Sequence, residues 1–115
     1  MDITNDKKIA DIQTEFSEKF SNLKIEFYQT PHEVGEGTKE ELKYDPNSTI
    51  GEIRKKGSEG DLSIHGNLKV ETLESKLAEQ FGLNAQVFRK SGNVWLQTTK
   101  TDDWTLSEQN DRGAI

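Results

Sequence analysis

Two stretches of the chain carry an apolar residue at every third or fourth position. The first stretch contains Ile9, Ile12, Phe16 and Phe20. The second contains Val70, Leu73, Leu77 and Phe81. Polar and charged side chains lie between them, so each pattern predicts an amphipathic helix with one apolar face. Gly82 directly follows the second stretch, as is typical of a helix end.

Two shorter stretches, residues 23–29 (LKIEFYQ) and 61–66 (DLSIHG), alternate between apolar and polar side chains. The apolar side chains are those of Leu23, Ile25, Phe27, Leu62 and Ile64. Because successive side chains of a strand point to opposite faces, both stretches are predicted to be half-buried strands. Pro31 is expected to stop the first of them.

Residues 83–90 and 93–99 predict two further strands that form a hairpin. The unit from residue 61 to 89 then reads as strand, helix, strand, which predicts a parallel pair with a right-handed crossover. The hairpin adds an antiparallel strand. The expected fold is α+β, a two-layer sandwich with a mixed four-stranded sheet and helices on one face, in the order α-β-(α)-β-α-β-β-(α).

Two short sequences match the capping box that begins many helices. Thr49 and Glu52 form one match, and Thr105 and Glu108 form the other. They predict a short helix from residue 50 and a short C-terminal helix. Residues 1–115 are expected to form a single domain without an internal repeat, with a flexible acidic loop at about 30–47 and a C-terminal tail at about 100–115.

The two tryptophans of the chain lie close together, Trp95 in the hairpin and Trp104 just after it. The register of the hairpin decides which face each of its side chains occupies. If Ser91 and Gly92 are the loop residues, Phe88 lies opposite Trp95. Val87 then lies opposite Leu96 on the other face, which is the natural choice for the core. A directly opposed aromatic pair stabilises a hairpin by about 0.5–1.5 kcal/mol beyond its buried area.

Two interpretations of this aromatic pair are open. In one, Phe88 and Trp95 form an exposed platform for a ligand, a peptide or a base, with Arg89 and Lys90 beside it. In the other, the C-terminal tail folds back and Trp104 covers that face, with Leu106 completing a small separate core. Large exposed aromatic patches are rare on monomeric proteins, so we expect Trp104 to cover the pair.

Composition narrows the possible partners. The chain has 115 residues, 31% of them charged, and a net charge of −6, which opposes general binding to nucleic acids or anionic membranes. It contains no cysteine, which excludes disulfides, thiolate metal sites and a cysteine nucleophile. The first residues include acids and no apolar run, so no signal peptide or membrane anchor is expected, and the predicted location is cytoplasmic.

Candidate chemical groups are few. His32, Glu33 and Glu36 in the acidic loop could hold a divalent ion, although a solvated loop is the better interpretation. His65 is expected to be a polar residue at a strand end. Nucleophile-elbow and phosphate-loop motifs are absent from the sequence, and acid pairs such as Asp102–Asp103 are adjacent in sequence. We therefore expect no catalytic residue, no metal site and no cofactor.

The stretch FGLNAQVFRKSGNVWLQTTKTDDWTLSEQN, residues 81–110, resembles a family of small uncharacterised bacterial proteins of the kind found in Bacteroidetes. The resemblance covers about the last third of the chain. It implies no activity, and it carries no catalytic or binding residues over to this sequence.

The sequence is best explained by a non-enzymatic module that binds a protein or peptide, or a second copy of itself. An edge strand or the surface around Phe88, Arg89, Lys90, Trp95 and Trp104 would make the contact. The alternative is single-stranded nucleic acid or a small ligand stacked on the aromatic face. A metal-dependent enzyme that uses a histidine and the acidic loop ranks third.

Overall fold

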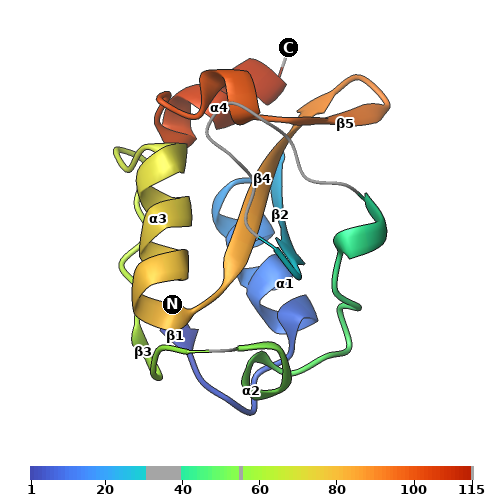
Figure 1. Cartoon of the computed structure of the whole chain (residues 1–115). Coiled ribbons are helices and arrows are strands. Elements are labelled where there is room, and N and C mark those ends of the chain that lie inside the picture. Colours follow the sequence, from blue (N-terminus) through green and yellow to red (C-terminus); the bar gives the residue numbers. More distant parts are fainter. Residues whose placement is uncertain (31–39, 55, 115) are drawn as a thin grey trace.

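A computed structural model describes residues 1–30, 40–54 and 56–114 of the chain as an α+β fold (Figure 1). The strands are β1 (Asp2–Ile3), β2 (Leu23–Tyr28), β3 (Gly60–Asp61), β4 (Asn84–Ser91) and β5 (Val94–Gln97). The α-helices are α1 (Ile9–Lys19), α2 (Ile50–Ile53), α3 (Val70–Phe81) and α4 (Leu106–Gly113). Two short 3-10 helices, η1 (Glu40–Leu42) and η2 (Thr99–Thr101), complete the described elements.

The main sheet has three antiparallel strands in the order β2-β4-β5, and β1 pairs with β3 in a separate two-stranded sheet. The predicted mixed four-stranded sheet is therefore wrong for the described part of the chain, and the parallel crossover does not form. Of the predicted strand at 61–66, Asp61 alone pairs, together with the preceding Gly60, and their partner is β1. Leu62 and Ile64 are buried nevertheless, because an extended segment inserts both side chains into the core. Their alternation reflects this insertion and not membership of the main sheet.

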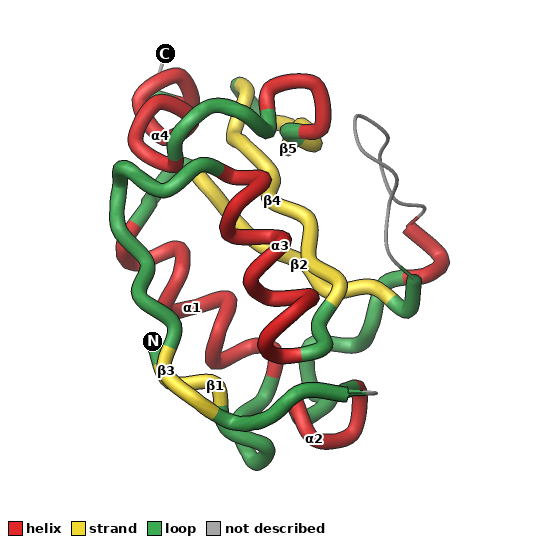
Figure 2. Tube along the Cα trace, turned by 60° about the vertical axis from the view of Figure 1, so that its left-hand side comes forward, coloured by secondary structure: helices red, strands yellow, loops and turns green. Residues whose placement is uncertain are grey.

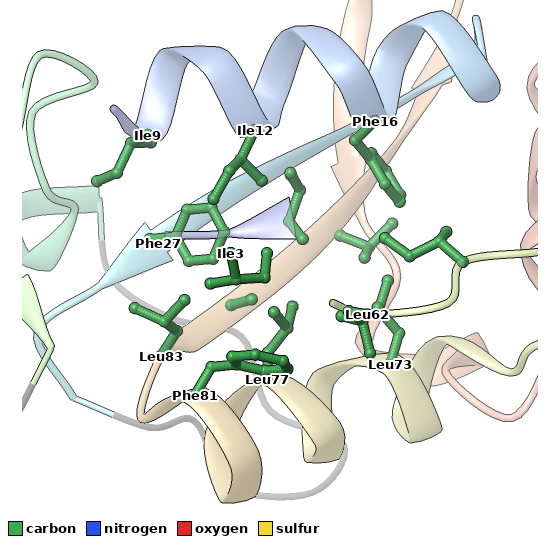
Figure 3. Close-up of a cluster of buried hydrophobic side chains, with 14 of the residues drawn as sticks. Ile3, Ile9, Ile12, Phe16, Phe27, Leu62, Leu73, Leu77, Phe81 and Leu83 are labelled. Carbon is green, nitrogen blue, oxygen red and sulfur yellow. The ribbon is translucent and has the colours of Figure 1, made fainter. Parts of the chain in front are cut away.

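The two long helices form where the apolar spacing predicts them, and both cover the same face of the main sheet (Figure 2). Figure 3 shows the core between them. Ile12 and Phe16 of α1 point toward Leu73 and Leu77 of α3, and Leu62 lies in between. The core is thus shared by both helices, the sheet and the extended segment, which buries enough apolar surface to support a chain of this size.

One backbone arrangement occurs at the start of all four α-helices. A four-residue turn is closed by a hydrogen bond and is followed by one extended residue, which is the N-cap, and then by a buried apolar residue that begins the helix. The N-caps are Lys8, Thr49, Lys69 and Thr105. The first helical residues are Ile9, Ile50, Val70 and Leu106, each at most 1% exposed. The expectation of no internal repeat is therefore wrong, because a short unit recurs four times.

These starts are joined in pairs, α1 with α2 and α3 with α4. Bridges connect Lys8 to Thr49 and Lys69 to Thr105. In the second pair, the N–H of Val70 donates to the carbonyl of Trp104 at 3.0 Å, and the N–H of Leu106 donates to that of Leu68 at 2.8 Å. The first pair repeats the exchange, from Ile9 to Ser48 and from Ile50 to Lys7. Helix starts normally leave such N–H groups without a partner in the helix, and here the turn before the partner helix supplies a carbonyl for each.

The turn that precedes each helix has a consistent composition. Two positions before the N-cap stand Asp6, Asn47, Asn67 and Asp103. Short Asp and Asn side chains favour turns because they can bond to nearby backbone groups. Both predicted capping boxes are confirmed, since Thr49 and Glu52, like Thr105 and Glu108, exchange hydrogen bonds between side chain and backbone.

Part of the predicted acidic loop, residues 31–39, lies outside the described residues, and so do His32, Glu33 and Glu36. The described remainder runs along the outer edge of β2, where Lys43 bridges to Tyr28. The Lys43 ammonium lies 2.9 Å from a carboxylate oxygen of Glu26 and 2.7 Å from one of Glu40. These contacts raise the pKa of Lys43 and lower that of Glu40.

Candidate functional site at the edge strand and the C-terminal helix

The β4–β5 hairpin turns at Gly92 and Asn93, one residue later than predicted. Gly92 occupies the first loop position with φ of +58°, a conformation that favours glycine. Trp95 therefore lies opposite Lys90, and Phe88 lies opposite Gln97. The predicted direct opposition of Phe88 and Trp95 is wrong. The register shift is two residues, an even number, so both rings still lie on the same face.

Lys24 of β2 lies between the two rings on this outer face. Its ammonium nitrogen is 5.1 Å from the centre of the Phe88 ring and 5.2 Å from that of Trp95. Both distances suit a cation–π contact. Phe88 is only 8% exposed, whereas Trp95 is 40% exposed. Only the outer ring of the pair is therefore accessible, and a lysine already lies against it.

Arg89 faces the opposite way, toward α4. Its Nη1 donates to Oε1 of Gln109 at 2.8 Å, and its guanidinium carbon lies 5.7 Å from the centre of the Trp104 ring. Because Arg89 follows Phe88 along the strand, the two side chains occupy opposite faces. Trp104 thus lies on the helix-bearing side of the sheet. The expectation that it covers Phe88 and Trp95 is wrong.

The path of the chain after β5 explains this placement. Thr98 is 2% exposed and binds Val87 twice, through its N–H at 3.2 Å and its hydroxyl at 2.9 Å. The η2 turn follows immediately and leads the chain toward α3. There Leu106 is fully buried and belongs to the main core, so it does not form a separate small core as predicted.

Strand β5 is the most apolar exposed segment in the described part of the chain. Val94, Trp95 and Leu96 are 57%, 40% and 42% exposed, and they are its exposed large apolar side chains. Ladder hydrogen bonds alternate along an antiparallel pair, and Ser91–Val94 closes the loop. The backbone groups of Val94 and Leu96 therefore face β4, and those of Trp95 point outward. Among the described strands, none pairs with this outer edge.

A surface hollow of about 350 Å³ adjoins Trp104 on the same side of the sheet as Leu96. Its lining comes from the C-terminal segment, namely Trp104, Glu108, Asp111 and Arg112. Glu108 accepts a hydrogen bond from the N–H of Thr105 at 3.0 Å, which holds the pKa of this carboxyl below its usual range. The hollow thus presents an aromatic ring next to the side chains of two acidic residues, Glu108 and Asp111.

The other candidate groups are dispersed. His65 is exposed in the turn before α3, where its carbonyl accepts from Leu68. Asp102 and Asp103 lie in the turn before α4. Within residues 1–30, 40–54 and 56–114, no three histidine or acidic side chains gather in a way that could hold a metal ion. Lys90 is exposed beside Trp95, as the strand pattern predicts.

Sequence reasoning missed Lys24, Leu96 and the α4 carboxylates. Lys24 belongs to β2, and only the pairing of β2 with β4 places it opposite Phe88. Leu96 is exposed because it lies on the edge strand β5. The predicted four-stranded sheet had placed its side chain on the core face. Glu108 was recognised as a capping residue, and that role leaves it next to Trp104.

Comparisons with known proteins identify no relative of this chain. No protein-family model matches the chain, and no curated protein or solved structure gives a significant match. Within the described residues, no helix has the length and apolar character needed to cross a membrane.

Proposed function

We propose that this chain is a non-enzymatic binding module that takes up an extended segment of a partner protein as an additional strand beside β5. The observation that carries the proposal is the run of three exposed apolar residues, Val94 to Leu96, on an edge strand. Strand addition supplies main-chain hydrogen bonds for affinity and alternate side-chain contacts for specificity.

The opposite edge of the sheet is covered. The N–H of Tyr44 donates to the carbonyl of Phe27 at 2.8 Å, and the carbonyl of Leu42 accepts from Gln29 at 2.9 Å. These bonds place residues 42–44 along β2. Natural sheets usually protect their edges by such cover, so an uncovered apolar edge indicates a pairing surface.

The part of β4 that extends beyond β5 is also covered. The N–H of Val87 donates to a carboxylate oxygen of Glu74, on α3, at 3.0 Å, and its carbonyl is bound by Thr98. Pairing at this side of the sheet is thereby limited to β5. The described structure thus directs an added strand to one short segment.

Stacking of a nucleic acid or small ligand on the outer face is less well supported. Phe88 is buried, Lys24 lies against both rings, and Arg89 points to the other side. Of the proposed basic anchors, Lys90 alone remains beside Trp95 on that face. The net charge of −6 also opposes a polyanion.

The test compares two substitutions at one position, Trp95→Ala and Trp95→Pro. Both remove the indole, but only proline removes the outward N–H, and an edge position tolerates proline when that group faces solvent. Linear peptides selected from a random display library on the wild-type chain are the probe. We expect Trp95→Ala to retain measurable binding in fluorescence anisotropy and Trp95→Pro to lose it.

Equal binding by the two variants would overturn strand addition, provided that circular dichroism and urea unfolding show both to be folded. Sedimentation velocity of the chain alone tests whether a second copy of this chain, instead of another protein, supplies the added strand. If the chain dimerises and Trp95→Pro abolishes the dimer, the added strand is a second copy of β5, and the proposal of a separate partner protein is wrong.

A further inference from the structure

The hollow beside Trp104 lies next to the proposed pairing strand. Leu96 lies opposite Arg89 in the hairpin ladder, and the Arg89 guanidinium contacts the Trp104 ring. Both views place β5 and α4 at the same end of the molecule (Figures 1 and 2). A strand added beside β5 has alternate side chains on the Val94 and Leu96 face, which is also the face that carries α4.

The charges around the hollow favour a cation. Glu108 and Asp111 line it, and Asp102 and Asp103 immediately precede Trp104 in the chain. Three cations oppose this preference, namely Arg112, which also lines the hollow, Arg89, and Lys69, whose charge acts on the Glu108 carboxyl. The four acids still outnumber them. In the described residues, Arg112 forms no ion pair with Glu108 or Asp111 that would neutralise them.

The aromatic ring adds a second attraction. A tryptophan face binds an ammonium or guanidinium group through its ring quadrupole, more strongly than the other aromatic side chains do. Gln109 fixes the Arg89 guanidinium at 2.8 Å, and Gln109 is itself held by the carbonyl and hydroxyl of Thr101, both at 2.7 Å. This chain of hydrogen bonds fixes the guanidinium that lies 5.7 Å from the centre of the Trp104 ring before any ligand arrives.

We propose that the hollow formed by Trp104, Glu108, Asp111 and Arg112 binds a lysine or arginine side chain of the partner. The inference rests on the proposed function for the source of that side chain, an extended protein segment. The hollow, at about 350 Å³, is large enough for one long side chain and is open to solvent on the side away from the core. Among the segments that can pair with β5, the hollow therefore favours those with a lysine or arginine.

The experiment titrates the isotope-labelled full chain with N-acetylarginine methylamide and follows the two indole N–H signals by NMR. Trp104 reports on the hollow, and Trp95 is an internal reference. The matched neutral probe is N-acetylcitrulline methylamide, which has nearly the same shape without the charge. We expect the arginine probe to shift the Trp104 signal, an effect that salt weakens, and the citrulline probe to leave it in place.

Variants of the acids give a second readout. Asp111→Asn should weaken binding of the arginine probe several-fold, and Arg112→Gln should strengthen it because a competing cation is removed. Glu18→Gln, on the exposed side of α1, is the matched control and should bind like the wild type. Equal shifts from both probes, or unchanged binding in Asp111→Asn, would overturn the inference.

The experiments distinguish failure of the cation site from failure of strand addition beside β5. If the arginine probe does not bind but library peptides still distinguish Trp95→Ala from Trp95→Pro, β5 is a pairing strand without a basic-side-chain site. If the arginine probe binds but the two Trp95 variants behave alike, the cation site stands and the proposed function is wrong.

Discussion

Tyr28 ends β2 with its side chain almost fully buried. Its hydroxyl has no hydrogen-bond partner within the described part of the chain. Burial is the main cause that raises the pKa of Tyr28 to about 12, and the negative charges of Glu26 and Glu40 contribute. A buried hydroxyl without a partner costs free energy on folding, so this hydroxyl lowers stability relative to a phenyl ring at the same position.

We predict that Tyr28→Phe leaves the free energy of unfolding unchanged or raises it at neutral pH. The unfolded tyrosine loses its proton near pH 10 and the folded one near pH 12. The native state therefore binds more protons in this window, and wild-type stability falls as pH rises from about 10 to 12, by on the order of 2 kcal/mol. Urea unfolding as a function of pH should show this fall in the wild type and in Tyr44→Phe but a smaller one in Tyr28→Phe.

At the scale of single residues, face assignments were predictable and contacts were not. Alternation along β4 and β5 places Phe88 and Trp95 on one face in any register shifted by an even number. The contact of Lys24 with both rings depends on the pairing of β2 with β4, which brings together residues more than sixty positions apart. No local pattern contains that information.

The paired helix starts lead to a prediction at the scale of elements. First-turn N–H groups of a helix usually exchange rapidly with solvent, because they have no partner in the helix. Val70 and Leu106 are bonded to each other's preceding segments, so their amides should exchange as slowly as those in the middle of α3. Native-state hydrogen exchange measures this directly. Fast exchange at both positions would show that the pairing does not persist in solution.

Substitution of the N-cap tests the same feature. Thr105→Ala removes the acceptor for the N–H of Glu108 and should cost about 1 kcal/mol in the free energy of unfolding. It should also speed the exchange of the Val70 amide, because the two helix starts share hydrogen bonds. Ser107→Ala, at an exposed position of the same helix, is the control and should change neither quantity. A loss of stability without faster exchange at Val70 would contradict coupling of the two starts.

Helices were predictable from the sequence because their determinants are local, namely apolar spacing, capping boxes and a terminal glycine. The sheet was not. Leu62 and Ile64 alternate as a strand would, but backbone pairing depends on distant residues. In this segment, only Gly60 and Asp61 belong to a strand, which pairs with β1. The repeated helix start was also missed, because its turn positions share chemical character and not identity.

At the scale of the whole molecule, the C-terminal helix is part of the core. Leu106 is fully buried, and Gln109 links Arg89 of the sheet to Thr101. We predict that Leu106→Ala lowers the free energy of unfolding by about 2–4 kcal/mol, as expected for a core leucine. Leu96→Ala, on the exposed edge strand, should cost less than about 1 kcal/mol. Urea unfolding measures both effects. If the C-terminal helix were instead a detachable tail, both substitutions would have similarly small effects on the free energy of unfolding.

The pairing of helix starts also divides the chain into two halves. The α1–α2 pair closes within residues 1–54, and the α3–α4 pair closes within residues 65–113. Between the halves, the β2–β4 and β1–β3 pairings and the common core carry the association. Fragments 1–56 and 57–115, produced separately, should therefore recombine into the native fold, and this chain can serve as a split reporter whose reassembly is driven by strand pairing.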